Sequence, residues 1–475
     1  GASGLVASAG AKTQSLLSAN VGRLRKFVAS AGQVIETLLS ENTAGQSDGF
    51  VTATTLEFST RHASLDLPSS FGVRDPTDLC FAPDTTSLLI SYSLPKRSLV
   101  PARKRDAAAI KRISGAGILC VWKLHRTSFP WAVLRCVGSP TCCLVSTTKP
   151  YLAFAGTAEG ALQVWDLRDA ASAHPMVVID DEQLALRSPT YCSDGITNGV
   201  HATPIVDLRA LPSPSDCDDL SVASLEEEGS LVIWLVMETD DAQPDMLDYG
   251  QAVGARVRLL KSNAIEALPP LKGRRGGDEG RSRTGRTVLP TRCLRLSFLA
   301  TDPSRFVVGD DVGRVLHRSR YSDTAPTPRS FDHHYHESTA AVSSLSFCPS
   351  QPAYLLAGRA DGSVSLYHVD DGQPLLSWQG FSSGGIVQLA WATTRPPLFW
   401  VVDSCDTMHV FDLLEAVGRP SLSVPLRPSK PNATANGAAG TAVERKPMRF
   451  ALDVAPPVAR GKARRMMATT YRSDG

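Results

Sequence analysis

The sequence lacks several features that would place it in a familiar class. No apolar run in its 475 residues approaches the roughly 18–20 residues of a membrane-spanning helix. A charged segment followed by an apolar core, the pattern of a secretory signal, is also missing at the start. The 49 Lys and Arg residues nearly balance the 47 Asp and Glu residues, unlike the basic excess of nucleic-acid binders. These absences predict no membrane insertion, no nucleic-acid binding and a cytosolic location.

Cysteine motifs are equally scarce. None of the ten cysteines forms a Cys-x-x-Cys pair, and Cys142 and Cys143 are adjacent within an apolar run. Scattered cysteines on apolar strands are typical of buried thiols in a reducing compartment rather than of a disulfide framework. The sequence also contains no His-Glu-x-x-His zinc motif, no Walker phosphate loop and no Gly-x-Gly-x-x-Gly motif after a strand. It therefore predicts no cofactor.

Two motifs resemble catalytic or metal-binding patterns. Residues 380–384 match the Gly-x-Ser-x-Gly esterase elbow, but the segment 386–391 that follows is typical of a strand, and the elbow requires a helix there. His333, His334 and His336 suggest zinc, but His336 lies six residues before a predicted strand at Val342, where a structural histidine is expected. We expect no catalytic residue and no metal ligand.

What the sequence does contain is a repeated unit of strands. In residues 153–167 a short apolar strand meets a tight turn at Glu159-Gly160, and a second strand ends at Trp165-Asp166. This is half of a four-stranded propeller blade, with the Trp-Asp pair that gives WD repeats their name. Six such units end at Trp122, Trp165, Trp234, His317, Tyr367 and Phe411. Among these closing positions, His317 departs from the aromatic pattern. We predict an all-β, seven-bladed WD40-type propeller with irregular blades.

The predicted structural positions of the repeats follow from this pattern. They are Trp122, Glu159, Trp165, Asp166, Trp234, His336, Asp361, Tyr367, Phe411 and Asp412. The spacings between closing positions are 43, 69, 83, 50 and 44 residues, so the two long gaps contain insertions, one roughly at 180–200 and another at 240–254 and 272–286. A seventh blade is incomplete, and we expect residues 50–58 to supply its missing strand, because a propeller must close.

Two segments are candidate partner contacts. Residues 20–42 have the apolar period of an amphipathic helix, including Leu24, Phe27, Ile35 and Leu38, and this short helix packs either on the propeller or on a partner. The segment therefore divides the chain into a helical part, 1–49, and a propeller, 50–475. Residues 96–112, which include Arg103, Lys104 and Arg105, form a basic loop that is either simply solvated or binds an acidic protein.

The amino-acid sequences of the blades also resemble those of a known family. Residues 120–122, 133–134, 141–144 and 154–168 are similar to dynein intermediate chains, especially to the longer intermediate chain of cytoplasmic dynein-2, the motor of retrograde intraflagellar transport. The resemblance continues through residues 189–196, 306–313 and 356–363, and includes the helical segment 23–41.

This resemblance implies a non-catalytic subunit whose propeller binds the dynein heavy-chain tail, in the cytoplasm and the cilium. The second intermediate chain of the same motor is then a further partner, and light chains bind upstream of this sequence. Two alternatives remain open from the residues: another WD40 scaffold, such as a ubiquitin-ligase substrate receptor, and a propeller enzyme with a site in its central channel.

Overall fold

A computed structural model describes two compact units, Gly1–His62 and Ala63–Gly475. The described residues are 32, 65, 67–84, 86–96, 111–179, 182–193, 201–211, 220–238, 250–252, 254–268, 291–321, 326–333, 339–392, 395–426, 450–454 and 465–469. In the first unit only Gly32 is described, and it is helical and exposed. The rest of the predicted helix at 20–42 lies outside the described residues. No described helix is long and apolar enough to cross a membrane.

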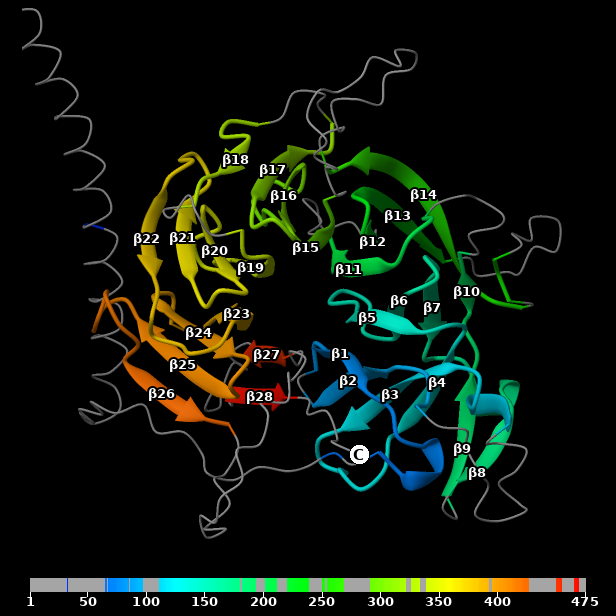
Figure 1. The fold of residues 1–475 in the computed structure, drawn as a ribbon. Helices are drawn as coiled ribbons and strands as arrows, with labels where there is room; N and C mark the ends of the chain where they lie inside the picture. The colour runs from blue at the N-terminus through cyan, green and yellow to red at the C-terminus, as the bar shows by residue number, and fades with distance from the viewer. Residues whose placement is uncertain are drawn as a thin grey trace, which may run out of the picture. The chain divides into compact units, whose positions relative to one another are not determined.

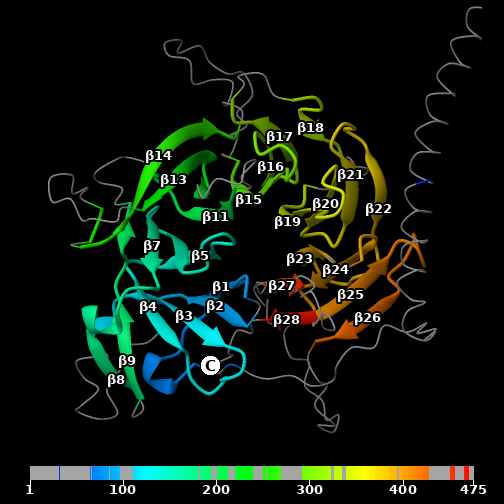
Figure 2. The ribbon, with the colours of Figure 1, turned by 180° about the vertical axis from the view of Figure 1, so that it is seen from behind.

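The second unit consists of antiparallel sheets arranged around one axis (Figure 1; Figure 2 shows the other side). Blade 1 contains β1 (Pro76–Phe81), β2 (Ser87–Tyr92), β3 (Gly117–Lys123) and β4 (Ala132–Cys136). Blade 2 contains β5 (Pro140–Val145), β6 (Leu152–Thr157), β7 (Leu162–Asp166) and β10 (Tyr191–Cys192). Blade 3 contains β11 (Ile205–Ala210), β12 (Leu220–Glu226), β13 (Ser230–Glu238) and β14 (Val257–Glu266).

The remaining blades follow in chain order. Blade 4 contains β15 (Cys293–Phe298), β16 (Arg305–Asp310), β17 (Val315–Ser319) and β18 (Ser330–Phe331). Blade 5 contains β19 (Val342–Phe347), β20 (Tyr354–Arg359), β21 (Val364–His368) and β22 (Pro374–Trp378). Blade 6 contains β23 (Ile386–Trp391), β24 (Leu398–Asp403), β25 (Thr407–Asp412) and β26 (Leu422–Pro425), and blade 7 is described by β27 (Phe450–Val454) and β28 (Arg465–Thr469). Two short 3-10 helices, η1 (Ser69–Phe71) and η3 (Ala171–Ala173), lie in connections.

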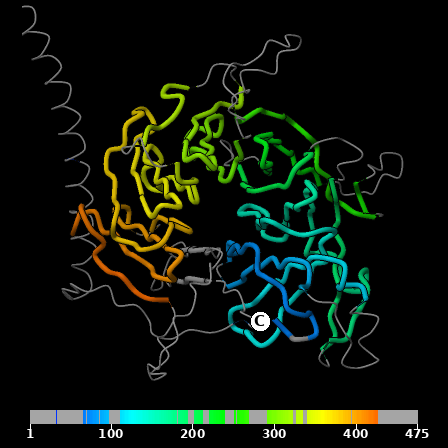
Figure 3. The backbone as a smooth tube through the Cα atoms, in the orientation of Figure 1, coloured from blue at the N-terminus to red at the C-terminus, as the bar shows by residue number. Residues whose placement is uncertain are grey.

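The first strands of the blades close into a ring. Around the axis β1 contacts β5, β5 contacts β11, and so on to β23, while β27 contacts both β23 and β1. The tube in Figure 3 follows this path through blades 1 to 6. The predicted all-β, seven-bladed propeller is therefore confirmed. The prediction that residues 50–58 complete blade 7 lies outside the described residues and stays a prediction.

The fit between neighbouring blades depends on small residues in the second strands. A Cβ added to Gly156 would lie 2.6 Å from Ile205 Cγ2, and one added to Gly309 would lie 2.5 Å from Val342 Cγ1. The space beside Gly358 is occupied in the same way by Ile386 of the next blade. The β-branched residue that begins one first strand thus occupies the space left by a glycine in the preceding blade. This interlocking fixes the spacing of the first strands around the axis.

The tight turns between second and third strands require a left-handed backbone. Gly160, Gly229, Gly313 and Gly362 have φ values between 83° and 101° at this position. Blade 6 places Asp406 there instead, with φ 59°, a conformation that short polar residues tolerate best after glycine. The turn-forming role predicted for Glu159-Gly160 and Asp361-Gly362 agrees with these dihedral angles.

The first insertion, predicted roughly at residues 180–200, begins earlier and contains two strands. After β7 the chain leaves blade 2 and forms a hairpin of β8 (Met176–Ile179) and β9 (Glu182–Arg187). Strand β9 pairs in parallel with β4, so blade 1 has the order β1-β2-β3-β4-β9-β8 (Figure 1). The apolar alternation of these short strands explains the difference, because Val177, Leu184 and Leu186 extend the buried core of blade 1. Residues 272–286 of the second insertion lie outside the described residues.

Candidate interaction surfaces

The predicted aromatic positions lie on the third strands, within the packed cores of the blades. Trp122, Trp165, Trp234, Tyr367 and Phe411 are all essentially fully buried. His317 does not share their register. Leu355 pairs with Tyr367 and the equivalent Phe306 pairs with Arg318, so Arg318 occupies the aromatic position in blade 4. The turn of blade 4 is of ordinary length, so the predicted position His317 lies one residue before the true aromatic position.

Blade 3 contains a complete polar network around its aromatic residue. Trp234 Nε1 donates to Ser224 Oγ at 2.8 Å, and the same hydroxyl lies 2.7 Å from His201 Nε2. His201 Nδ1 lies 3.1 Å from Glu226 Oε2. His201 is therefore a structural histidine of blade 3, of the kind that the sequence predicts at His336 before blade 5. His336 itself lies outside the described residues. The sequence signal for His201 was its position four residues before β11, with Trp234 closing the same blade.

The predicted acidic positions organise turns rather than chemistry. Glu159 accepts the backbone N–H of Ser139 with both carboxylate oxygens, and Asp361 accepts the backbone N–H of Ser363 at 2.9 Å. Asp166 and Asp412 follow the closing aromatic residues and accept the N–H two residues later, at 2.9 and 3.0 Å. Each carboxylate is already held by groups of its own blade.

The Gly-x-Ser-x-Gly motif is built into blade 6. Ser382 Oγ donates to Asp403 Oδ2 at 2.6 Å, and His409 Nε2 lies 3.3 Å from the same oxygen. The carboxylate therefore lies between the serine and the histidine, whereas an acyl-transfer triad needs the histidine between serine and carboxylate. Burial raises the pKa of Asp403, but the hydrogen bonds from His409, Ser382 and the Thr407 N–H outweigh it and hold the pKa below its ordinary value. A carboxylate of this kind is a poor general base.

The first strands share a bulge that turns their third residue toward the next blade. The first strand of each of blades 1 to 6 shifts register between its first and third residues. These shifts lie at Pro76/Asp78, Pro140/Cys142, Ile205/Asp207, Cys293/Arg295, Val342/Ser344 and Ile386/Gln388. In blades 1, 3 and 5 the third residue is an acceptor. Asp78 Oδ2 accepts the Cys143 N–H at 2.9 Å, Asp207 Oδ2 accepts the Leu296 N–H at 2.9 Å, and Ser344 Oγ accepts the Leu389 N–H at 3.0 Å.

Blades 2 and 4 use donors instead, from the second residue of β5 and the third residue of β15. Thr141 Oγ1 donates to the Ile205 carbonyl, and Arg295 Nε donates to the Ser343 carbonyl at 2.6 Å. Side chains of the first strands therefore satisfy backbone groups of the first strand in the following blade. We call these residues, Asp78, Thr141, Asp207, Arg295 and Ser344, the axial belt.

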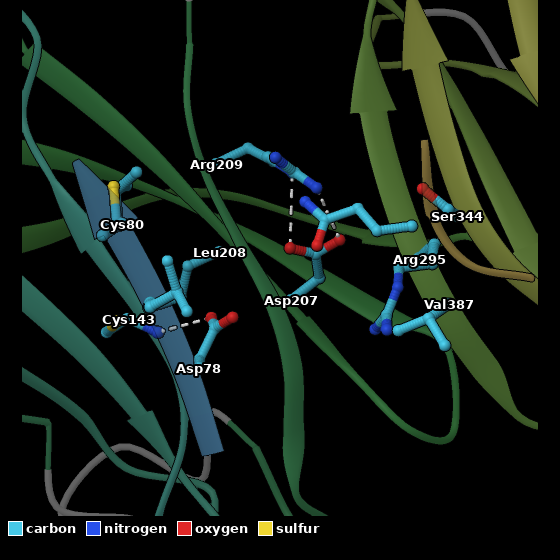
Figure 4. Close-up of a pocket in the computed structure, with 12 residues that line it drawn as sticks. Asp78, Cys80, Cys143, Asp207, Leu208, Arg209, Arg295, Ser344 and Val387 are labelled. Atoms are coloured by element: carbon cyan, nitrogen blue, oxygen red, sulfur yellow. Dashed lines mark hydrogen bonds and ion pairs between the residues drawn. The ribbon is translucent and has the colours of Figure 1, made fainter. Parts of the chain in front are cut away.

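Asp78, Asp207, Arg295 and Ser344 of the axial belt line a cavity of about 130 Å³, shown in Figure 4. Arg209 and Asp207 project into it as an ion pair with 3.3 Å between Nε and Oδ1, and Arg295 approaches from blade 4. The nearby Asp207 raises the pKa of Arg209, despite the opposing effect of burial. Two carboxylates and two guanidinium groups thus balance one another in a space of a few water molecules.

The cavity has no activated nucleophile among its described lining. Cys143 is the buried thiol closest to the belt, and burial, followed by the charge of Asp78, raises its pKa well above the ordinary value. A nucleophilic cysteine needs a lowered pKa instead. The nine cysteines that the structure describes form no disulfide, and no group of three metal-ligating side chains occurs in the described part of the chain. The channel is therefore built to hold the blades together.

The predicted partner contacts cannot be placed. Leu24, Phe27, Ile35 and Leu38 of the helix, and Arg103, Lys104 and Arg105 of the basic loop, lie outside the described residues. They remain predictions.

Comparison with known proteins assigns the chain to a family. No protein-family model matches it. It is 29% identical over 435 residues to "Cytoplasmic dynein 2 intermediate chain 1" of Mus musculus, covering 86% of this chain and 42% of that protein. The Homo sapiens protein of the same name is 30% identical over 421 residues, covering 83% of this chain and 38% of that protein. The chain belongs to the dynein intermediate chains.

Other dynein intermediate chains match more weakly over similar lengths. "Cytoplasmic dynein 1 intermediate chain" of Drosophila melanogaster is 22% identical over 419 residues, covering 87% of this chain and 53% of that protein. Because the matches to dynein-2 intermediate chain 1 cover more than four fifths of the chain, the similarity extends over the propeller as a whole and not over single blades. The chain spans less than half the length of these dynein-2 relatives.

Proposed function

We propose that this chain is a non-catalytic intermediate chain of cytoplasmic dynein-2, whose propeller binds the dynein heavy-chain tail. In this role it supports retrograde intraflagellar transport, in the cytoplasm and the cilium. The second intermediate chain of the motor is a further partner, and light chains bind upstream of the propeller. The observation that carries the proposal is the match to dynein-2 intermediate chain 1 over more than four fifths of the chain.

The described geometry supports a binding role. Ser382, Asp403 and His409 lie in the wrong order for acyl transfer, and the Asp207–Arg209 ion pair and the backbone bonds of Asp78 and Arg295 occupy the charges of the axial cavity. The polar groups that sequence patterns offered as chemistry are used to hold turns and blades. A scaffold needs this rigidity, because its partners recognise a fixed arrangement of loops and edges.

Affinity capture of the full-length protein from ciliated cells tests the proposal. Mass spectrometry of the captured material should find a dynein heavy chain and a second intermediate chain. Recovery of cullin-linked adaptors in their place would overturn the proposal in favour of a ubiquitin-ligase receptor. Turnover of a hydrolase substrate that depends on channel residues would instead establish a propeller enzyme.

A pair of variants separates the propeller from the upstream region. Trp234→Ala removes a fully buried side chain of blade 3 and should release the heavy chain while light chains remain bound. Tyr321→Ala is the matched control, because Tyr321 is 76% exposed and its loss should leave both sets of partners in place. Retention of the heavy chain by the Trp234→Ala protein would contradict heavy-chain binding by the propeller.

A further inference from the structure

The outermost strands of blades 2 to 6 are protected against pairing with another chain. Strands β10 and β18 contain only two residues each. Strand β14 carries Arg258, Lys261 and Glu266, and its register is interrupted by a bulge. Strand β22 begins at Pro374 beside a bulge, and β26 ends at Pro425. Shortness, charge, proline and bulges are the devices by which natural sheets avoid edge-to-edge association.

Strand β8 of blade 1 has four residues and, within them, neither charge nor proline nor bulge. Its sequence is Met-Val-Val-Ile, without charge or proline, and it pairs with β9 in unbroken register from Met176↔Ala185 to Ile179↔Glu182. In the part of the chain that the structure describes, no strand pairs with the outer edge of β8. Figures 1 and 2 both show β8 at the periphery of blade 1, on the far side of β9 from β4.

The hydrogen-bond phase of the hairpin shows which groups face outward. The Leu186 N–H donates to the Pro175 carbonyl at 2.9 Å, so Pro175 and Leu186 form a hydrogen-bonded pair. In an antiparallel ladder such pairs alternate, so Val177 and Ile179 direct their backbone groups toward β9. Met176 and Val178 therefore direct their N–H and C=O groups toward the outer edge.

The side chains of β8 present apolar surface on both faces. Val177 and Ile179 are buried with Leu184 in the core of blade 1, while Met176 and Val178 are 52% and 40% exposed on the opposite face. An added strand would therefore meet the rim of the core on one face and this Met-Val pair on the other. Charged side chains in that strand would lose hydration on either face without an opposite charge in β8.

We propose that the outer edge of β8 is a docking site for an extended, uncharged segment of a partner protein, which adds a further strand to blade 1. Main-chain hydrogen bonds to Met176 and Val178 would supply the binding, and the flanking apolar side chains would select uncharged residues. The proposal goes beyond the proposed function and does not depend on the partner being a dynein subunit.

A second copy of the chain fits this edge less well. At about 800 Å² from 20–30 residues per partner, four residues from each copy would bury roughly 250 Å², far below the ~1,000 Å² of a stable interface. A segment of a partner that is also bound elsewhere on the chain needs to bury much less area, because its local concentration reaches the millimolar range. The small edge thus favours a tethered strand over self-association.

Hydrogen exchange locates the added strand directly. The full-length protein is compared alone and in the complex in which it is isolated from cells. We expect exchange at the Met176 and Val178 amides to slow by about tenfold or more in the complex, because both amides gain a main-chain acceptor. Equal exchange in the two samples would overturn the proposal, even if the complex contains a dynein heavy chain.

Three substitutions at one position test the hydrogen bonds. Val178→Pro removes the outward N–H while leaving the ladder to β9 intact, and should weaken the complex by about tenfold. Val178→Thr keeps the N–H and a β-branched shape and should bind normally. Val178→Lys keeps the N–H but adds an edge charge, and should weaken binding even if the proline variant folds poorly.

The alternative occupant gives a different result. If the isolated wild-type chain sediments as a dimer and Val178→Pro makes it monomeric, the edge binds a second copy and the proposal is wrong. If all three variants bind alike with unchanged thermal midpoints, the edge is not a docking site. Loss of binding by Val178→Pro and Val178→Lys with normal binding by Val178→Thr supports the added strand.

Discussion

The first strands and the outer strands of this propeller follow different rules. At the axis, six first strands repeat one bulge, and in blades 1 to 5 a side chain near the bulge bonds to a backbone group of the next blade. Farther from the axis, the blades differ from one another. Blade 3 has a complete His-Ser-Trp network, and blade 4 has Arg318 in place of an aromatic residue. In blade 1 the sheet is extended by a hairpin that follows blade 2 in the chain.

The difference has a geometric cause. First strands contact two neighbours around a narrow axis, so a change in one must fit both, whereas an outer strand meets solvent on its free side. The axis therefore preserves closure, and the periphery is free to differ for binding. Substitutions near the axis should accordingly cost more than chemically similar substitutions in the outer parts of the blades.

The largest effect is expected where blades interlock. Gly309→Val would place a side chain within the space occupied by Val342, and overpacking of this kind should lower the free energy of unfolding by about 3 kcal/mol or more. Gly418→Ala is the control, because no atom lies within 4 Å of its added Cβ. Urea unfolding of both proteins measures the difference. Equal stability would show that the blades can separate without cost.

An acid-sensitive group in blade 4 should follow next. Burial, and then the neighbouring Arg305, lower the pKa of His317 to about 4 from 6.5, although the Pro328 carbonyl and Asp370 act in the opposite direction. Below pH 6.5 the unfolded chain binds a proton that the folded chain refuses until about pH 4. Stability should therefore fall across this window, by about 3 kcal/mol in total at 1.36 kcal/mol per unit.

Substitution isolates this contribution. His317→Gln keeps a group that can accept the Arg305 N–H, and should lose stability at pH 7 but flatten the dependence between pH 6.5 and 4. Urea midpoints at several pH values measure the slope. His125→Gln is the matched control, because His125 is exposed. If the His317→Gln protein keeps the wild-type slope, the acid sensitivity arises elsewhere.

The ring was predictable from the sequence, but its departures were not. Alternating apolar residues and the turn glycines marked the blades, because these patterns are local. His317 was matched to the aromatic positions by sequence, and only strand pairing showed that Arg318 holds the position. The sequence marked the region of β8 and β9 only as an insertion, because four to six residues of alternation carry little signal without knowing that β4 offers an edge.

The candidate surfaces were the least predictable part. The axial belt depends on which side chain near the start of each first strand faces the next blade. That orientation follows from a bulge that no local sequence pattern marks. The role of His201 was likewise missed, because it depends on contacts in space with Ser224 and Glu226. The exposed edge of β8 is a property of the assembled sheet.

A smaller loss is expected in the axial belt. Asp207→Ala leaves the Leu296 N–H without its acceptor and Arg209 without its ion-pair partner, and should lower stability by about 2 kcal/mol. Asp207→Asn keeps an acceptor oxygen and should lose less. Thermal unfolding of both proteins compares them. An alanine variant no less stable than the asparagine variant would contradict a role for this side chain in joining blades 3 and 4.

The smallest effect distinguishes two buried tryptophans of neighbouring blades. Trp234 Nε1 donates to Ser224, whereas Trp165 Nε1 is buried without a hydrogen-bond partner among the described residues. Replacement by phenylalanine removes similar apolar area at both sites, but only Trp234→Phe also breaks a hydrogen bond. That variant should therefore be the less stable of the two by about 1 kcal/mol in urea unfolding. Equal losses would mean that the polar network of blade 3 adds no stability, and that its histidine and serine serve only to orient the loop before β11.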